Sequence, residues 1–498
     1  MPGKPIMVQG TGSHVGKSIT VTALCRIFAR RGYRTAPFKA QNMALNSYVT
    51  ADGGEIGRST AEQAFAAGIA PTVEMNPILL KPSSEVGSQV ILRGKPIGHY
   101  PARDYWQLKP TLFDIVQTSL RTMLETYDVV VIEGAGSPAE INLKAHDLVN
   151  MRVARWAQAP VLLVGDISLG GVFAWLYGTL ALLPEEERVL VRATLINKFR
   201  GDPKLLGDGL NQLTELTGVP VLGVVPDFGD LGIGEEDTVP TNRFGPWSQG
   251  GDLLRIAVIH YPFRSNFTDF DPFFHEPGVE VRYVTDPDLL NGCHVVCLPG
   301  TKQTMADLDW LRRYGFDKAL RECVEAGAFL VGLCGGYQML GERLEDPDGV
   351  ESALPEASGL GYLPITTRFN RDKALYQIEA IHEGSGLPIR GYEIHMGESR
   401  LLRPITPLVR IRTRNGQGVE LPDGAIDPNG RVWGCYVHGL FDNPDFRRRF
   451  LRQVRDAFGL PTPPSVASGA QNPYDRLADG FEQHVDMGLL WKILAKEA

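Results

Sequence analysis

Cysteine is scarce in this chain, and its few copies are poorly placed for cross-linking. Six cysteines occur in 498 residues, and none of them forms a CxxC pair. Their spacing therefore argues against a disulfide framework and against a zinc site. Cys293 and Cys297 lie in a short apolar run that is typical of a buried strand, so we expect both to pack in a core.

The chain also lacks long apolar runs and an excess of positive charge. No run approaches the roughly 20 apolar residues that a membrane-spanning helix needs, and no signal-peptide pattern precedes the first strand-like run at Pro5. We therefore expect a cytoplasmic protein without a membrane partner. The formal net charge of −8 gives no support to nucleic-acid binding. An anionic substrate would have to meet a local cluster of positive groups.

Pattern and composition divide the chain into two large α/β domains. Its 498 residues, 43% apolar and 22% charged, are typical of a globular protein too long for one compact core. Up to about residue 230, continuous apolar strands alternate with helical segments, as in a parallel sheet covered on both faces. A second α/β unit begins at residues 254–259. The boundaries that we predict are 1–232 for the first domain, 233–252 for a linker, 253–459 for the second domain and 460–498 for a C-terminal tail.

The tail carries one amphipathic pattern. Apolar residues recur there at helical spacing, namely Leu477, Phe481, Val485 and Leu489. We expect a single final helix whose apolar stripe docks on another part of the chain and has no catalytic role.

A strand, a glycine-rich loop and a helix-like segment open the chain. Residues 5–9 read PIMVQ, and residues 10–18 read GTGSHVGKS. In such a loop, backbone N–H groups face phosphate oxygens, the lysine neutralises charge, and the serine hydroxyl can bind Mg²⁺. The residues that we expect to contact ATP are Gly12, Val15, Gly16, Lys17 and Ser18. The alternative is a glycine-rich turn that contains a lysine by chance, and Thr11 does stand where the usual pattern has its first glycine.

Three more polar residues are candidates for the same site. Glu133 follows an apolar strand, where a carboxylate at the carboxyl edge of the sheet can hold Mg²⁺ or cap a turn. Asp52 is a second metal candidate, although Asp-Gly is also ordinary turn chemistry. Asn197 follows another strand and can present its amide to an adenine base or simply belong to a turn.

Two amide-rich segments suit a polar substrate that carries carboxylates and amides. The first is residues 41–47 (QNMALNS), and the second consists of two short stretches, residues 140–144 and 147–151. The candidate substrate contacts in them are Asn42, Asn46, Asn142 and Asp147. From spacing alone, these residues could equally lie in loops that satisfy their own backbone.

The most informative segment follows the apolar run at residues 328–331. Residues 332–340 read GLCGGYQML, and their glycines allow a sharp turn from a strand into a helix. A side chain at the tip of this turn is lifted above the sheet, and the helix N-terminus favours a thiolate there. We therefore interpret Cys334 as a nucleophile, against the alternative of an inert cysteine in the core.

A second short strand supplies a candidate base for this thiol. Residues 433–439 read WGCYVHG, which we interpret as one strand that ends at His438. A histidine in this position can take the proton of a cysteine nucleophile.

Together these segments resemble two known families. The Cys334 segment with His438 resembles the glutamine amidotransferase domain of the cobyrinate-amidating type. Residues 10–18 with residues 133–136 (EGAG) resemble dethiobiotin synthetase and its relatives, which explains the shifted first glycine. The resemblance implies an N-terminal doubly wound α/β domain with a P-loop and a C-terminal α/β glutamine amidotransferase domain.

Longer motifs extend the resemblance to the cobyric acid synthases over nearly the whole chain. These motifs are residues 41–47, 136–143 (GSPAEINL) and 391–397 (GYEIHMG). The family implies a ligase that uses ATP, Mg²⁺ and L-glutamine to amidate the b, d, e and g carboxylates of adenosylcobyrinic acid a,c-diamide. An acyl phosphate makes each carboxylate reactive toward ammonia, which is best generated locally because it is mostly protonated near neutral pH.

The same resemblance implies roles for the candidate residues. Cys334 would attack the glutamine amide while His438 shuttles the proton, and backbone N–H groups near Gly300 and after Cys334 would form the oxyanion hole. Glu133 and Asp52 would assist the Mg²⁺ held by Ser18. Asp147 would help to position the acyl phosphate or its metal.

One position departs from the wider amidotransferase class. Triad enzymes carry an acid two residues after the histidine, but Leu440 stands there in this chain. The cobyrinate-type relatives share this lack, so we predict a Cys–His dyad whose orienting group is unidentified. Glu393 is a candidate for that group on motif grounds.

Three alternatives and one open question remain from the sequence. Cobyrinic acid a,c-diamide synthase performs the same chemistry on other carboxylates, although the segment at residues 41–47 argues against it. A ParA/MinD-like switch ATPase would use the phosphate loop but not Cys334 or His438. A scaffold with decayed sites would not keep Lys17 and Ser18. The oligomeric state stays open, a homo-oligomer included.

Overall fold

The computed structural model describes residues 2–84, 87–234, 243–248, 250, 252–352, 354–463 and 472–496. The chain folds into two compact units, of which the first comprises Met1–Ala44, Glu55–Ile233 and Gly469–Ala498. The second comprises Leu45–Gly54 and Gly234–Ser468. A short segment of the N-terminal half thus folds with the second unit, and the tail folds with the first. The predicted linker at residues 233–252 lies partly outside the described residues.

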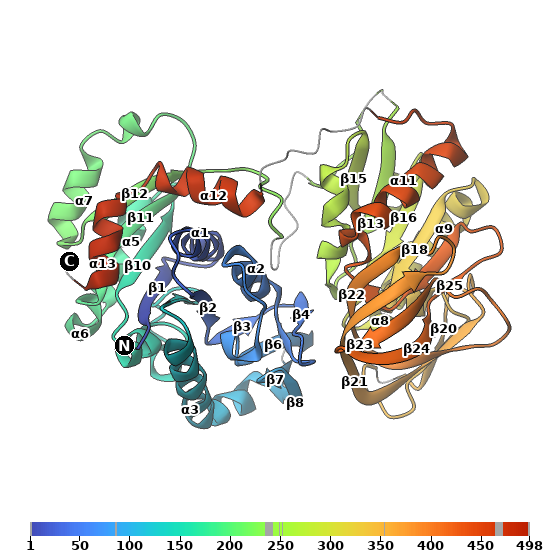
Figure 1. Cartoon of the computed structure of the whole chain (residues 1–498), viewed down its shortest axis with the longest axis horizontal. Coiled ribbons are helices and arrows are strands. Elements are labelled where there is room, and N and C mark those ends of the chain that lie inside the picture. The colour runs from blue at the N-terminus through green and yellow to red at the C-terminus, as the bar shows by residue number, and fades with distance from the viewer. Residues whose placement is uncertain are drawn as a thin grey trace. The chain divides into compact units, whose positions relative to one another are not determined.

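A six-stranded parallel sheet forms the centre of the first unit (Figure 1). Its strands are continuous apolar runs, and β9 is buried along its whole length because helices cover both faces. In spatial order the strands are β12 (Val221–Pro226), β11 (Val191–Phe199), β10 (Val161–Asp166), β1 (Lys4–Gly10), β9 (Val129–Glu133) and β2 (Thr35–Lys39). The predicted doubly wound fold is confirmed.

Helices pack on the two faces of this sheet. One face carries α1 (Lys17–Arg30), and the opposite face carries α3 (Ala102–Thr126), α4 (Met151–Ala157), α5 (Val172–Leu182) and α7 (Gly209–Thr217). The shorter helices of the unit are α2 (Arg58–Ala66) and α6 (Glu185–Arg188). A separate sheet, which the sequence did not predict, contains β3 (Gln41–Met43), β6 (Ile78–Ser84), β7 (Gly87–Leu92) and β8 (Lys95–Pro101). The short strand β5 spans Glu55–Gly57.

The tail contains two helices, so the prediction of one continuous helix was wrong. These are α12 (Pro473–Glu482) and α13 (Met487–Ala495), and both pack on the α1 face of the parallel sheet (Figure 1). Val485 lies between them and forms an antiparallel bridge with Gly223. The side chain of Asp486 then accepts a hydrogen bond from the backbone N–H of Leu489 at 2.9 Å and starts a new helix.

The second unit is built on another parallel sheet, as predicted for an α/β domain. Its strands in spatial order are β15 (Val279–Val284), β13 (Leu254–Ile259), β16 (Val295–Leu298), β18 (Phe329–Leu333), β26 (Val432–Cys435) and the antiparallel edge strand β25 (Ala425–Ile426). Helices α8 (Thr304–Arg313) and α9 (Phe316–Glu325) pack in one core with one face, and α11 (Pro444–Phe458) packs in the other core. The turn from β18 leads into the short helix α10 (Gly335–Met339).

A mixed, mostly antiparallel sheet completes the second unit. Its path runs β20 (Glu356–Ser358), β19 (Arg343–Glu345), β21 (Ile365–His382), β22 (Pro388–Leu401) and β27 (Val437–His438), with β23 (Val409–Arg414) and β24 (Gln417–Asp423) paired beside β21. The chain changes sheets at Tyr436, so the single strand predicted to end at His438 is in fact two. Consequently Cys334 follows a strand of the parallel sheet, and His438 belongs to the mixed sheet.

Smaller elements position the loops of the second unit. Strand β4 (Ser47–Val49) lies in the segment Leu45–Gly54, strand β14 (Arg264–Ser265) pairs with β17 (Gly300–Thr301), and the 3₁₀ segment η5 covers Phe267–His275. Across the described residues of both units, no helix is long and apolar enough to cross a membrane.

Candidate active sites

The glycine-rich loop between β1 and α1 is held against the end of β11. Gly16 has φ of 98°, in the left-handed region that favours glycine, and a Cβ there would lie 1.9 Å from Nδ2 of Asn197. The same Nδ2 donates a hydrogen bond to the carbonyl of Val15 at 2.9 Å. Asn197 lies within β11, not after it as expected, and its NH₂ group is bonded to the backbone of the loop. A contact between Asn197 and adenine stays a prediction.

Lys17 is almost fully buried beneath this loop. Its Nζ donates to the carbonyls of Gly12 at 2.7 Å and Gly136 at 3.1 Å. Burial lowers the pKa of Lys17 to about 8, although nearby Glu133 opposes this shift. An ammonium group that is hydrogen-bonded to neutral carbonyls is well placed to be attracted by phosphate oxygens.

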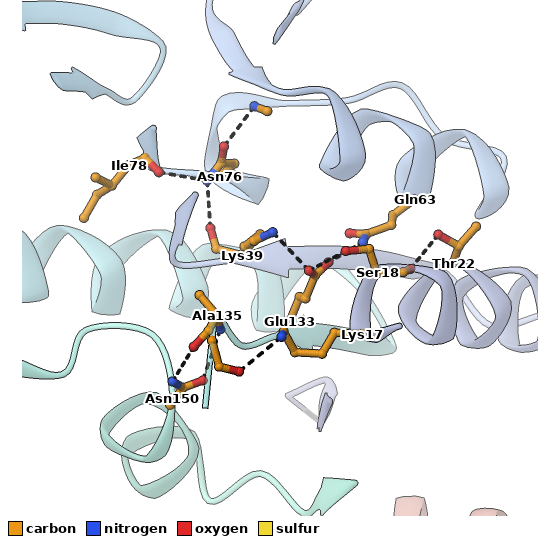
Figure 2. Close-up of polar contacts among 12 residues, drawn as sticks. Lys17, Ser18, Thr22, Lys39, Gln63, Asn76, Ile78, Glu133, Ala135 and Asn150 are labelled. Carbon is orange, nitrogen blue, oxygen red and sulfur yellow. Dashed lines mark hydrogen bonds and ion pairs between the residues drawn. The ribbon is translucent and has the colours of Figure 1, made fainter. Parts of the chain in front are cut away.

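Glu133, at the end of β9, is the centre of a polar cluster (Figure 2). Its Oε1 accepts hydrogen bonds from Ser18 Oγ at 2.8 Å and Lys39 Nζ at 3.0 Å, while Oε2 accepts one from Gln63. Burial alone would raise the pKa of Glu133, but Lys39 and the hydrogen bonds lower it, so the carboxylate is charged. The structure thus brings together Ser18 and Glu133, both predicted to hold a metal.

Lys39 and Gln63 were not predicted for this site. Lys39 ends β2, and the strand register places it directly opposite Glu133. If β2 had been recognised as a strand beside β9, a lysine and a glutamate at their ends would have predicted this ion pair. Gln63 lies on α2 and gives no such signal.

The structure does not complete a metal site around this pair. Among the described residues, no group of three or more His, Cys, Asp or Glu side chains could hold a metal ion. Asp52 belongs to the second unit, where its carboxylate accepts a hydrogen bond from the Thr50 hydroxyl in a turn. This contact agrees with the alternative interpretation of Asp52 as a residue of an ordinary turn. Its part in a metal site stays a prediction.

The four candidate substrate contacts lie in different environments. Asn42 is buried in β3, Asn46 is buried in the second unit, and Asn142 is exposed. The carboxylate of Asp147 accepts hydrogen bonds from the backbone N–H groups of Val149, Asn150 and Arg152 at 2.9–3.0 Å. Asp147 therefore has a structural function at the start of α4, and its predicted action on the substrate is untested.

Asn150 is a further residue that the sequence did not single out. Its Oδ1 accepts from the N–H of Ala135 at 3.1 Å, and its Nδ2 donates to the carbonyl of the same residue at 2.7 Å. It thereby fixes the loop after Glu133, whose Gly136 carbonyl contacts Lys17.

Cys334 lies at the tip of the predicted turn between β18 and α10. It has φ of 52° and ψ of −110°, an unusual conformation for a residue other than glycine. The two residues that follow must be glycine, because a Cβ on Gly335 would lie 2.5 Å from Cγ2 of Thr301 and a Cβ on Gly336 would lie 2.0 Å from the carbonyl oxygen of Leu298. The thiol donates to the carbonyl oxygen of Ile394 at 3.5 Å. A strained cysteine at a strand-to-helix turn is typical of a nucleophile that is held above a sheet.

Cys334, His438 and Gly300 meet at one point. A Cβ built on Gly300 would lie 3.2 Å from Cε1 of His438 and 3.6 Å from Cβ of Cys334. A Cβ there would also lie 2.9 Å from the carbonyl oxygen of Ser265, so only glycine allows this close approach to the pair. The position of Gly300 fits the predicted oxyanion hole, although donation by its N–H stays a prediction.

Asp269, on η5, is the acid paired with the histidine. Its Oδ2 lies 2.7 Å from Nδ1 of His438, and its Oδ1 accepts from the N–H of Gly439 at 2.8 Å. Burial alone would lower the pKa of His438, but Asp269 and Cys334 raise it to about 10. No local motif marks this residue, which lies 169 positions before the histidine.

Glu393, the candidate for this role from its motif, has another partner. Both of its oxygens accept hydrogen bonds from the guanidinium of Arg414 at 2.7 Å. Glu393 pairs with Val437 in the strand register, and its neighbour Tyr392 pairs with His438. The candidate was therefore one strand position away from the histidine, and its charge is neutralised elsewhere.

Comparison with known proteins gives matches over both units. Residues 6–237 match the model of the CobQ/CobB/MinD/ParA nucleotide binding domain, and residues 255–446 match that of the CobB/CobQ-like glutamine amidotransferase domain. The chain is 50% identical to a cobyric acid synthase of Sorangium cellulosum over 99% of both chains. It is 52% identical to that of Chloroflexus aggregans over 96% of both chains, and 47% identical to that of Thermoanaerobacter sp. over 99% of both.

These matches agree with the two sites that the structure shows. The first is a phosphate loop with Lys17, Ser18 and Glu133, and the second is a buried Cys334–His438–Asp269 arrangement. The chain is about 50% identical to these relatives over nearly its full length, and each of its two units matches one of the two family models. The chain belongs to the cobyric acid synthase family.

Proposed function

We propose that this protein catalyses the ATP- and glutamine-dependent amidation of the b, d, e and g carboxylates of adenosylcobyrinic acid a,c-diamide, a step of cobalamin biosynthesis. The observation that carries this proposal is the presence of a phosphate loop and a Cys–His–Asp arrangement in one chain. The relatives named cobyric acid synthase support the choice of substrate.

The second unit has the groups needed to release ammonia from glutamine. The Cys334 sulfur attacks the side-chain carbonyl carbon, the C–N bond breaks, and His438 gives the proton to the leaving ammonia. Water then attacks the thioester, His438 takes a proton from it, and glutamate leaves as Cys334 is restored. Asp269 is 2.7 Å from Nδ1 of His438, so it fixes the ring and leaves proton exchange with the reacting groups to Nε2.

The first unit has residues that fit a nucleotide and Mg²⁺. The left-handed Gly16, the buried Lys17 amine and the oxygen pair of Ser18 and Glu133 are the groups that phosphate oxygens and a magnesium ion prefer. When bound, ATP supplies the phosphoryl group that turns a carboxylate into a reactive acyl phosphate. Lys17 compensates the negative charge that develops on the transferred group. Ammonia then attacks the acyl carbon, and phosphate leaves.

The substrate contacts belong to this proposal rather than to the observed geometry. Asn42, Asn46 and Asn142 are amides that can accept or donate hydrogen bonds to the carboxylates and amides of a corrinoid side chain. We keep Asp52 as a proposed metal ligand and Asn197 as a proposed contact of the nucleotide.

Incubation of the purified protein with ATP, Mg²⁺, glutamine and adenosylcobyrinic acid a,c-diamide tests the function. We expect mass spectrometry to show stepwise conversion of carboxyl groups to amides, accompanied by glutamate. A parallel reaction with cobyrinic acid distinguishes the a,c-diamide synthase. ATP hydrolysis without any amide product would contradict the proposal and favour a switch ATPase.

The proposed metal site has its own test. Glu133→Gln keeps the size of the side chain but removes the charge that faces Ser18 and Lys39. We expect this variant to need several-fold more Mg²⁺ for half-maximal synthesis, with its glutamine dependence little changed. An unchanged metal requirement would contradict the assignment of Glu133.

A further inference from the structure

The segment Leu45–Gly54 comes from the N-terminal half of the chain but folds within the second unit. Val49 packs in a small buried cluster with Tyr392 and Ile394, two residues of β22. The carbonyl of Val49 also accepts a hydrogen bond from Gln377 of β21. The proposed function gives this segment no role in the glutaminase reaction, although it lies against the strand that pairs with His438.

Ser47 connects this segment to two side chains that contact His438. Its backbone N–H donates to Oδ1 of Asn266 at 2.9 Å, and its carbonyl accepts from the hydroxyl of Tyr392 at 3.2 Å. Asn266 Nδ2 in turn lies 3.5 Å from Nε2 of His438. The ring of Tyr392 stacks on the imidazole, with centroids 5.3 Å apart and planes at 20°.

Asn266 has a conformation that indicates a task other than stabilising its own helix. It is a buried residue in the left-handed region, with φ of 52° and ψ of 34°. Asparagine at the start of a helix ordinarily accepts a hydrogen bond from the helix backbone. In η5, which the structure describes in full, Asn266 makes no such bond. Its amide is directed instead at Ser47 and His438.

The partners of this amide determine which atom faces the histidine. A backbone N–H can only donate, so the Asn266 atom that faces Ser47 is the oxygen. The NH₂ group then faces Nε2 of His438, to which it can donate when the imidazole is neutral and acts as the base. Asp269 holds the opposite ring nitrogen, and Tyr392 covers a face of the ring. Two of these three restraints on the imidazole, from Asn266 and Tyr392, are themselves bonded to Ser47.

We propose that the segment Leu45–Gly54 positions the histidine base of the glutaminase through Asn266 and Tyr392. This inference rests on the proposed function, because it assigns positioning residues for the same glutamine hydrolysis. Without the Ser47 backbone, the Asn266 amide can rotate and the Tyr392 ring loses its anchor, so His438 samples unproductive orientations. Glutamine hydrolysis therefore depends on the docking of this segment.

The segment is joined to the first unit at both of its ends. Ala44 separates it from β3, which carries the candidate substrate contact Asn42, and β5 begins at Glu55.

The first test removes one hydrogen atom from the backbone. Ser47→Pro deletes the N–H that holds Asn266, and Ser47→Ala is the matched variant that keeps it. We expect glutaminase kcat of Ser47→Pro to be about tenfold below that of Ser47→Ala, with KM for glutamine changed little, as for loss of one buried hydrogen bond. Circular dichroism and thermal unfolding of both variants establish that they are folded.

A second test asks whether Ser47 acts through Asn266. In an Asn266→Ala background, Ser47→Pro should have little further effect on kcat, because the interaction is already lost. Asn266→Asp keeps an oxygen for Ser47 but turns a negative oxygen toward Nε2. The titratable groups around the imidazole are then Asp269, Cys334, Tyr392 and the new carboxylate. We expect the alkaline limb of the glutaminase pH profile to move to higher pH, a shift that a purely structural role would not produce.

The outcomes separate this inference from the proposed function. If the wild-type protein does not hydrolyse glutamine, the proposed function fails and this inference fails with it. If it does, equal kcat values for Ser47→Pro and Ser47→Ala overturn the inference alone. Independent, multiplicative effects of Ser47→Pro and Asn266→Ala would also overturn it, as would an unchanged pH profile in Asn266→Asp.

Discussion

The two candidate sites are assembled in different ways. In the phosphate loop, residues that lie within nine positions of one another provide the cradle, and the strand ends of β9 and β11 close it. At the glutaminase site, the partners of His438 come from residues 266, 269 and 392, far from it in the sequence. A continuous motif thus specifies the first site, whereas tertiary packing specifies the second.

The pKa values of the two key cations are shifted in opposite directions, although both groups are buried. The amine of Lys17 is surrounded mainly by carbonyl groups, and burial lowers its pKa to about 8. The imidazole of His438 is also buried, but Asp269 and Cys334 raise its pKa to about 10. A carboxylate in direct contact therefore outweighs the loss of solvent. The first site thus holds a cation that is hydrogen-bonded to neutral carbonyls, and the second holds a cation in direct contact with a carboxylate.

Cys334→Ala should produce the largest effect and separate the two sites. It removes the nucleophile, so we expect glutamine-driven synthesis to fall by at least about 10⁴-fold. Added ammonia should restore amidation, more so at alkaline pH, where more of it is NH₃. The measurement compares glutamine-driven with ammonia-driven product formation. A parallel loss of both would show that the sites cannot be separated in this way.

Asp269→Asn should weaken the glutaminase site without removing its reacting groups. General acid–base contributions suggest a loss of about 10²- to 10⁴-fold in glutaminase kcat, with ammonia-driven synthesis retained. Because Asp269 favours the protonated imidazole, its loss lowers the pKa of His438. The alkaline limb of the pH profile should therefore move to lower pH. Glu393→Gln is the matched control, since that carboxylate pairs with Arg414; an equal loss there would contradict the assignment.

Lys17→Ala should disable the other site, the phosphate loop. It removes the charge that faces the transferred phosphoryl group, so we expect synthesis to fall by about 10²- to 10³-fold. Activation of the carboxylate precedes attack by ammonia from either source, so added ammonia should not rescue this variant. Ammonia-driven amidation at the wild-type rate would remove the phosphate loop from the mechanism.

The same contrast explains what the sequence could and could not predict. The Gly-Lys-Ser loop, the Cys334 turn and the strand with Glu133 are local patterns, and the structure shows the elements expected for them. Lys39 was missed because β2 was not recognised as a strand. In the sheet, Lys39 at the end of β2 pairs with Glu133 at the end of β9. The sequence around Asn266 and Asp269 is that of an ordinary loop and contains no recognisable motif. The two residues contact His438 because η5 packs against β27 in the folded chain.

For the domain organisation too, local patterns could be predicted and long-range contacts could not. The two α/β units follow from strand and helix periodicity, but exchange of chain segments between units does not. The composition of residues 45–54 does not assign them to the C-terminal unit. They belong to it through long-range contacts with Asn266, Gln377 and Tyr392, which the sequence does not reveal. The break between α12 and α13 depends on a bridge from Val485 to Gly223, which is likewise a long-range contact.

Asp147 provides the smallest expected effect and tests whether a motif residue is structural or functional. Its carboxylate accepts three backbone N–H groups at the start of α4, so Asp147→Ala should lower the free energy of unfolding by about 1–2 kcal/mol. Asp147→Asn keeps one acceptor oxygen and should lose less. Urea unfolding of both variants, alongside ammonia-driven synthesis, separates the two roles. If Asp147→Asn unfolds like the wild type but makes product much more slowly, the residue acts on the substrate or its metal, as the resemblance implied. If synthesis follows stability across the two variants, its task is to hold the start of α4 and, through Asn150, the loop after Glu133.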